Sequence, residues 1–236
     1  MKKKGCALRH FSPCAGQEYR IGRTMHDVRG ERERKFWMIC SVILLYTVFL
    51  PLYGKADTSG ASGVINTFNA TLMECMKGAD KLGYSGRFKL LEPVIRNSFA
   101  MSYMASQSAG RYWKTFQERE QSILTKTYTE WSIATYARRF DEYLGERFEV
   151  VSESAPDQGI VTVVSKIIQP NKEDVVFYYK LRIIDGAWRI VDIQVSGVSQ
   201  LALTRSQFVN VIKEKGFDGL ISLLKNKIEG LSQGKR

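Results

Sequence analysis

Four consecutive segments in the second half of the chain alternate apolar and polar side chains with a period of two, which is typical of half-buried β-strands. Turn-forming residues separate them at 156–159, 170–171 and 185–186. Short turns join antiparallel neighbours, so we predict a four-stranded antiparallel meander with one buried face. The predicted strands span residues 147–154, 160–168, 174–184 and 187–196.

Helical periodicity flanks the predicted sheet on both sides. Pro93 is expected to interrupt one of the preceding helices. After the sheet, Thr204 is expected to cap a helix that ends at Gly216, and another helix follows from Asp218. Helices before and after an antiparallel sheet predict an α+β fold. The helices expected before the sheet cover residues 64–76, 86–99, 101–110 and 123–145.

The composition changes abruptly near the N-terminus. Residues 1–35 carry ten Lys/Arg and four Asp/Glu, and residues 36–53 form an apolar run without any charged residue. A basic flank, an apolar stretch and small residues just before position 57 predict an export signal that is cleaved after Ala56. Because this basic region is longer than signal peptides usually carry, we interpret residues 1–24 as an extension and Met25 as an alternative start.

Cleavage would leave residues 57–236 as a single exported domain. The competing interpretation keeps residues 36–53 as an uncleaved membrane anchor, because about 18 apolar residues reach the lower limit for spanning a bilayer. Pro51 and the small residues Gly54 and Ala56 favour cleavage. Export from the cytoplasm follows from either interpretation.

The net charge of +11 is unevenly distributed along the chain. Residues 1–56 hold eleven Lys/Arg and four Asp/Glu, whereas residues 57–236 hold 24 and 20. Most of the basicity therefore belongs to the export segment, whose cytoplasmic flank is expected to be positive. We expect no nucleic-acid partner, and only weak, transient attraction of the exported domain to an anionic bilayer.

Both histidines, His10 and His26, precede the predicted cleavage site. The exported domain would then hold no Ser-His-Asp or Cys-His arrangement and no His-containing zinc site. Cys75 would be its only cysteine, which excludes an intramolecular disulfide. We therefore expect no catalytic residue, no metal and no cofactor.

An apolar face of the predicted sheet and an aromatic helix stripe provide the material for an apolar cavity. Core packing gives the same pattern, so the cavity is inferred from the whole set of residues. Methionines suit a pocket that accepts ligands of variable shape. The candidate lining residues are Met101, Met104, Trp113, Phe116, Tyr128, Tyr136, Phe140, Val161, Val163, Phe177, Tyr179, Leu181, Val191 and Ile193.

Several stretches, in this order, resemble a known family. They are MKGADKLGYSGRF (Met76–Phe88), ATYARRF (Ala134–Phe140), GERFEV (Gly145–Val150) and WRIVDIQVSGVSQLALTRSQF (Trp188–Phe208), the last being the most specific and ending in RSQF. They look like the MlaC or toluene-tolerance family of periplasmic lipid-binding proteins, and more closely its hopanoid-associated branch, HpnM. The resemblance covers about residues 64–224.

This resemblance implies an NTF2-like cone, in which a four-stranded antiparallel sheet and helices surround an apolar cavity. It also implies a monomeric periplasmic carrier of phospholipid or hopanoid, which exchanges lipid with an inner-membrane transporter and with outer-membrane lipid complexes. Arg205 in RSQF resembles a recurrent arginine of the family. Together with Arg138 it is a candidate for a polar mouth that meets the lipid headgroup. A structural role near the capped helix start or a sheet-to-helix salt bridge explains Arg205 equally simply, and a solvated helix face is the simpler explanation of Arg138.

Two alternatives to a soluble carrier stay open. One is a membrane-anchored interaction module of a lipid-transport or hopanoid pathway. The other is an isomerase-type enzyme that uses Asp192 with Tyr178 or Tyr179 for proton transfer in an apolar cavity. Strand alternation disfavours the enzyme, because it turns Asp192 away from the face that carries Val191 and Ile193.

Overall fold

The computed structural model of the chain describes residues 59–170 and 172–234. The predictions that concern the basic region, the export signal, cleavage after Ala56 and the alternative start at Met25 lie outside these residues.

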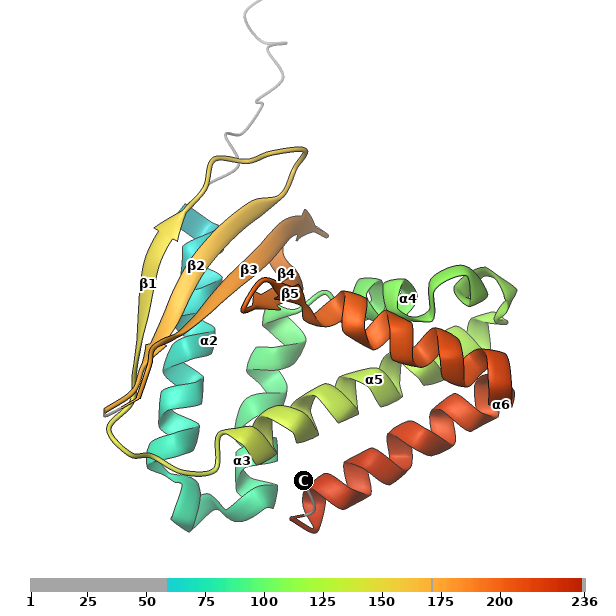
Figure 1. Cartoon of the computed structure of the whole chain (residues 1–236), viewed down its shortest axis with the longest axis horizontal. Helices are drawn as coiled ribbons and strands as arrows, with labels where there is room; N and C mark the ends of the chain where they lie inside the picture. Colours follow the sequence, from blue (N-terminus) through green and yellow to red (C-terminus); the bar gives the residue numbers. More distant parts are fainter. Residues whose placement is uncertain (1–58, 171, 235–236) are drawn as a thin grey trace, which may run out of the picture. The chain divides into compact units, whose positions relative to one another are not determined.

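The described residues form one antiparallel sheet, which precedes the C-terminal helix and has its strands in chain order (Figure 1). The α+β prediction is confirmed, but the sheet has five strands instead of four. The fifth strand was missed because two residues are too few to show a period of two; Ser196 and Gly197, both at positive φ, turn it back against its neighbour. The strands are β1 (Arg147–Glu153), β2 (Val161–Ile168), β3 (Val175–Ile184), β4 (Ala187–Val195) and β5 (Val198–Ser199).

Two helices, α2 (Ser59–Lys77) and α3 (Ala79–Ser98), pack against the sheet (Figure 1). α3 bends at Gly83, whose φ of 57° lies in the left-handed region that favours glycine. The predicted interruption at Pro93 is wrong: Pro93 lies exposed within the helix. At the N-terminal end of α2, a Cβ atom on Gly60 would lie 2.9 Å from Cδ1 of Trp188. This glycine therefore permits close packing of helix and sheet.

The remaining helices are α4 (Met101–Ala109), the 3₁₀-helix η2 (Gly110–Thr115), α5 (Glu118–Arg139) and α6 (Gln200–Ser232). α5 ends six residues before the predicted end at Gly145. α6 begins earlier than predicted, because Ser199 Oγ accepts a hydrogen bond from the amide of Ala202 and caps the helix there. The predicted cap Thr204 instead lies inside α6, which bends at Gly216 (Figure 1).

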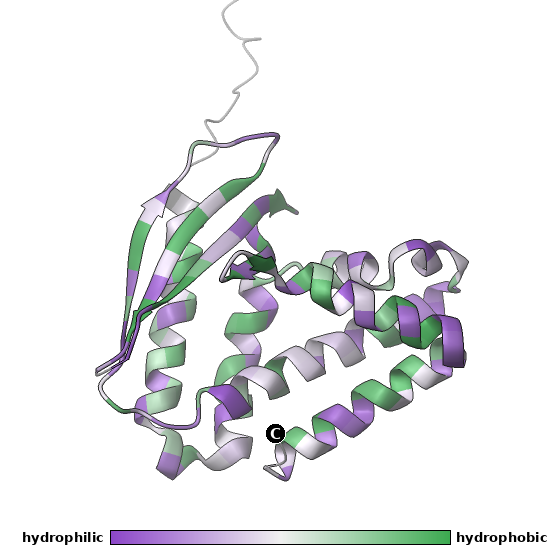
Figure 2. Cartoon of the chain, in the orientation of Figure 1, coloured by the Kyte–Doolittle hydropathy of each residue, from purple (hydrophilic) through white to green (hydrophobic). Residues whose placement is uncertain are grey.

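The buried face of the sheet follows the predicted alternation most regularly in β2, where buried and half-buried residues alternate along the whole strand. Figure 2 shows apolar and polar residues interspersed along β2 and β3. Val161 pairs with Leu181 and Val163 pairs with Tyr179, and all four side chains are buried. Phe68 of α2 packs edge-on against the Tyr179 ring, with centroids 6.4 Å apart. This contact joins α2 to the sheet in the main hydrophobic core.

Candidate functional site

A cavity of about 390 Å³ lies between the sheet, α5 and the start of α6. Its size falls within the range of small-molecule sites in proteins. Most of its lining is apolar or aromatic. The lining residues are Phe99, Met104, Tyr128, Trp131, Ser132, Thr135, Tyr136, Arg139, Phe140, Phe148, Phe177, Tyr179, Ile193, Val195, Gln200, Leu201 and Thr204.

The inner end of the cavity is apolar and tightly supported. Phe99, Met104, Tyr128, Tyr179 and Ile193 are each less than one tenth exposed. Behind them, fully buried Phe68 packs edge-on against Phe99 with ring centroids 5.2 Å apart. Such aromatic contacts hold side chains in fixed orientations, so this end of the cavity is preformed.

The outer end of the cavity is polar and half-exposed. It is built by Ser132, Thr135 and Arg139 of α5 and by Gln200 and Thr204 of α6. The three hydroxyls donate hydrogen bonds to backbone carbonyls four residues earlier in their own helices, at 2.8–2.9 Å. Their donors are therefore satisfied, and each oxygen keeps lone pairs that can accept a hydrogen bond.

The structure brings half of the predicted cavity residues together. The predicted residues that line the cavity are Met104, Tyr128, Tyr136, Phe140, Phe177, Tyr179 and Ile193. Val161, Val163 and Leu181 share the same sheet face but are fully buried in the core instead. Met101 is also buried in that core. Periodicity identifies the buried face of an element but does not tell where along that face the packing opens.

Trp113 and Phe116 lie away from the cavity, at the far end of the helical layer. Phe116 packs against Phe217 of α6 with ring centroids 5.0 Å apart. Trp113 accepts a hydrogen bond at its backbone carbonyl from Gln121. Both follow the apolar pattern, but they precede α5 in the chain and lie beyond its N-terminal end, whereas the cavity lies along its C-terminal half.

Val191 does not line the cavity because of a β-bulge. β3 pairs Lys180 with Asp192 and then Leu181 with Ile190, so Val191 is an extra residue without a partner on β3. Strict alternation therefore fails here.

Asp192, the carboxylate of the enzyme alternative, has a structural role. Its Oδ1 accepts hydrogen bonds from the amides of Ile193 and Leu201 and from the hydroxyl of Ser199, at 2.8–3.2 Å. The buried carboxylate thereby joins β4 to the start of α6, and it is not part of the cavity lining.

The two predicted arginines of the polar mouth lie outside the cavity lining. Arg205 is exposed on α6 and lies against Gly110, where an added Cβ would be 3.1 Å from Nε. Arg138 does not line this cavity, whereas its neighbour Arg139 does. Gln200 and Thr204 were missed because the helix start was predicted too late; alternation along β1 would have indicated Phe148.

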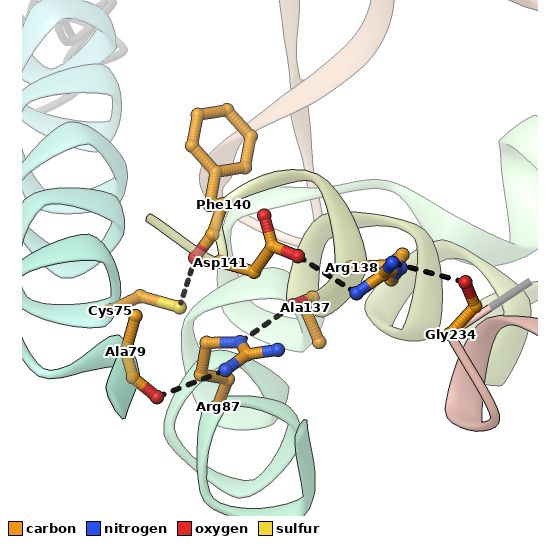
Figure 3. Close-up of polar contacts among 8 residues, drawn as sticks. All are labelled: Cys75, Ala79, Arg87, Ala137, Arg138, Phe140, Asp141 and Gly234. Atoms are coloured by element: carbon orange, nitrogen blue, oxygen red, sulfur yellow. Dashed lines mark hydrogen bonds and ion pairs between the residues drawn. The ribbon is translucent and has the colours of Figure 1, made fainter. Parts of the chain in front are cut away.

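The C-terminal end of α5 is fixed by side chains from other helices (Figure 3). Arg87 of α3 is 6% exposed and donates hydrogen bonds to the carbonyl of Ala137 (2.8 Å) and the carbonyl of Ala79 (3.0 Å). The Cys75 thiol donates to the carbonyl of Phe140 at 3.4 Å. Carbonyls at a helix end carry partial negative charge, so the Arg87 guanidinium stabilises the end of α5, beside the cavity.

The buried phenols of the cavity predict that the fold loses stability at alkaline pH. Burial raises the pKa of Tyr128 to about 12 and that of Tyr179 well above its ordinary value. An unfolded chain releases the Tyr128 proton near pH 10. The contribution of the protonated phenol to the free energy of unfolding is therefore fully present below that pH and is lost as pH rises through about 12. We expect Tyr128→Phe to reduce the loss by roughly 2 kcal/mol in denaturant titrations across this range. Identical pH profiles for the two proteins would contradict this assignment.

Comparison with known proteins identifies the family of the chain. A family model described as MlaC protein matches residues 66–226. The chain belongs to the MlaC family. This confirms the family resemblance in the sequence, whereas the closer relation to the HpnM branch stays a prediction.

Two proteins are similar to this MlaC-family chain, one in sequence and one in fold. Over 140 residues it is 26% identical to the intermembrane phospholipid transport system binding protein MlaC of Haemophilus influenzae, a match that covers 56% of this chain and 65% of that protein. Its fold is similar to that of a phospholipid-binding protein from Ralstonia solanacearum, solved in complex with a phospholipid. That similarity has a TM-score of 0.65 at 22% identity, and covers 73% of this chain and 98% of the other.

Two further observations apply to the described residues of this MlaC-family chain. No helix among them is long and apolar enough to cross a membrane. Within the same residues, no three side chains of His, Cys, Asp or Glu are grouped as a metal site requires.

Proposed function

We propose that this protein is a periplasmic carrier that binds a phospholipid, with the acyl chains in the cavity and the headgroup at its polar end. The observation that carries the proposal is a cavity with a preformed apolar inner end and with hydroxyl, amide and guanidinium side chains of α5 and α6 at its half-exposed outer end. The descriptions of the two relatives support a phospholipid as the ligand. Hopanoid is the competing ligand, since it also requires an apolar lining.

The physical chemistry of lipids explains what such a carrier does. Exposing each methylene group to water costs about 0.8 kcal/mol, so an acyl chain leaves a membrane very slowly by itself. A cavity that covers part of the chain lowers this cost for transport through water. The carrier would receive lipid from, or deliver it to, an inner-membrane transporter and outer-membrane lipid complexes. It would perform no chemical step on the lipid, and residues 36–56 would direct its export.

Native mass spectrometry of the exported protein, expressed from the full-length gene, tests this proposal. We expect one phospholipid bound per protein, identified after extraction, and a polypeptide mass that begins at Asp57. A mass that retains residues 36–53 would instead indicate the anchored module. Bound hopanoid with no phospholipid would change the ligand, and a protein that takes up neither lipid from vesicles would refute a carrier function.

A further inference from the structure

A second hollow, of about 790 Å³, lies directly beside the cavity, between α5 and the C-terminal half of α6. We call it the α5–α6 trough. It shares Trp131, Thr135 and Arg139 with the cavity lining, so the two hollows meet along one face of α5. The other residues that line the trough are Arg138, Asp141, Lys227, Gly230 and Leu231.

The α5–α6 trough carries an excess of positive charge. Its cationic side chains are Arg138, Arg139 and Lys227, and its one carboxylate is Asp141. Asp141 is already paired with Arg138, at 2.8 Å between Oδ2 and Nη1 (Figure 3). Within the described residues, no ion pair is formed by Arg139 or by Lys227. Two positive charges are therefore available to a ligand.

Contacts within the fold position two of the three cations, Arg138 and Lys227. Arg138 also donates from Nη2 to the carbonyl of Gly234 at 3.1 Å, which ties the end of α6 to α5 (Figure 3). Its buried Nε has no hydrogen-bond partner among the described residues. Lys227 Nζ lies 5.6 Å from the centroid of the Trp131 ring, a cation–π distance that holds the ammonium over the boundary between trough and cavity.

Arg139 connects the charge of the trough to the cavity itself. Its side chain lines both hollows. The Arg139 guanidinium also acts on Tyr136 inside the cavity, where it partly offsets the rise in pKa that burial causes. A ligand whose apolar part fills the cavity would therefore leave it past Arg139 and meet the α5–α6 trough next.

We propose that the α5–α6 trough is the headgroup subsite of the carrier, and that Arg139 and Lys227 make it select lipids with a net negative phosphate headgroup over zwitterionic ones. The inference rests on the proposed carrier function and adds the class of lipid. A guanidinium binds phosphate oxygens through two parallel hydrogen bonds, whereas an ammonium acts as a point charge. In a zwitterionic headgroup the phosphate charge is balanced by the lipid's own ammonium group, so two unpaired protein cations favour the anionic lipid.

A competition experiment tests this selectivity. Protein expressed from the full-length gene is stripped of lipid and incubated with vesicles that contain equal amounts of phosphatidylglycerol and phosphatidylcholine with identical acyl chains. Bound lipid is then counted by mass spectrometry. We expect the wild-type protein to prefer phosphatidylglycerol by about tenfold at low salt, and the Arg139→Gln, Lys227→Gln double variant to bind the two lipids nearly equally. Uptake from pure phosphatidylglycerol vesicles should fall more in this variant than uptake from pure phosphatidylcholine vesicles.

Matched variants make the result specific. Arg119→Gln with Lys213→Gln removes the same charges from exposed positions on the same two helices outside the trough and should keep the preference. Arg139→Lys with Lys227→Arg keeps both charges and should retain most of it. A wild-type protein that takes up both lipids equally would overturn the selectivity and leave the carrier function intact, whereas uptake of neither lipid would overturn the carrier function.

Two other outcomes would also overturn the headgroup assignment. The first is a double variant that loses both lipids equally, which would make the cations a general requirement for loading. The second is binding of glycerol 3-phosphate as tightly as of the anionic lipid, which would assign the trough to a free phosphate compound. We expect no saturable binding of glycerol 3-phosphate, because it lacks the apolar part that the cavity buries.

Discussion

Val195→Trp should reduce the lipid bound by the protein at least tenfold while leaving the fold intact. Val195 lies on β4 opposite Phe177, is half-buried, and lines the cavity. An indole ring at this position would occupy space in a cavity of only about 390 Å³. Each excluded methylene group forfeits about 0.8 kcal/mol, so displacing two of them is enough for a tenfold loss of affinity. Counting lipid per protein after incubation with vesicles measures the effect.

The matched control is Val151→Trp on β1, where the valine is 52% exposed and lies outside the cavity lining. It should bind lipid as the wild-type protein does, which separates blocked space from an effect of the new ring itself. Thr135→Trp would fill the cavity from the side of α5, and it replaces Val195→Trp as the test if that variant folds poorly. Normal lipid loading in a folded Val195→Trp or Thr135→Trp variant would mean that lipid binds elsewhere.

The sheet could be predicted closely from the sequence because its elements are long and regular. β2, β3 and β4 begin and end within one residue of the predicted bounds. Each presents an apolar face to α2 or the cavity, so burial imposes the period of two that the sequence displays. β5 and the bulge at Val191 escaped prediction since both depend on local pairing, which leaves no periodic signal.

The cavity could be predicted only in part, because it depends on where packing stops. Tyr179 and Leu181 occupy equivalent positions on β3, yet only Tyr179 reaches the cavity while Leu181 is covered by the core. The polar end depends on the cap at Ser199, which starts α6 early enough for Gln200 and Thr204 to face the cavity. Such differences arise from the relative placement of helices and sheet, which pattern alone does not specify.

Arg87→Met should lower the free energy of unfolding by about 3 kcal/mol. The guanidinium is buried and donates to two backbone carbonyls, one at the end of α5 and one at the start of α3. A hydrogen bond from a charged group contributes about 1.5 kcal/mol or more, and methionine keeps the apolar stem while removing both donors. For a chain of this length the loss corresponds to a decrease in Tm of about 6–12 °C, measurable by calorimetry.

Arg96→Met on the same helix is the control that decides the physical cause. Arg96 forms an i,i+4 ion pair with Glu92 at 2.9 Å, but the two side chains are 45% and 40% exposed. Solvent screening limits such a pair to about 0.5 kcal/mol, so its loss should change Tm by no more than about 2 °C. Because both variants remove one arginine from α3, a large difference between them isolates burial and the two backbone carbonyls as the source of stability. Equal decreases would show instead that Arg87 contributes only its charge to the domain, and that the end of α5 is held by apolar packing.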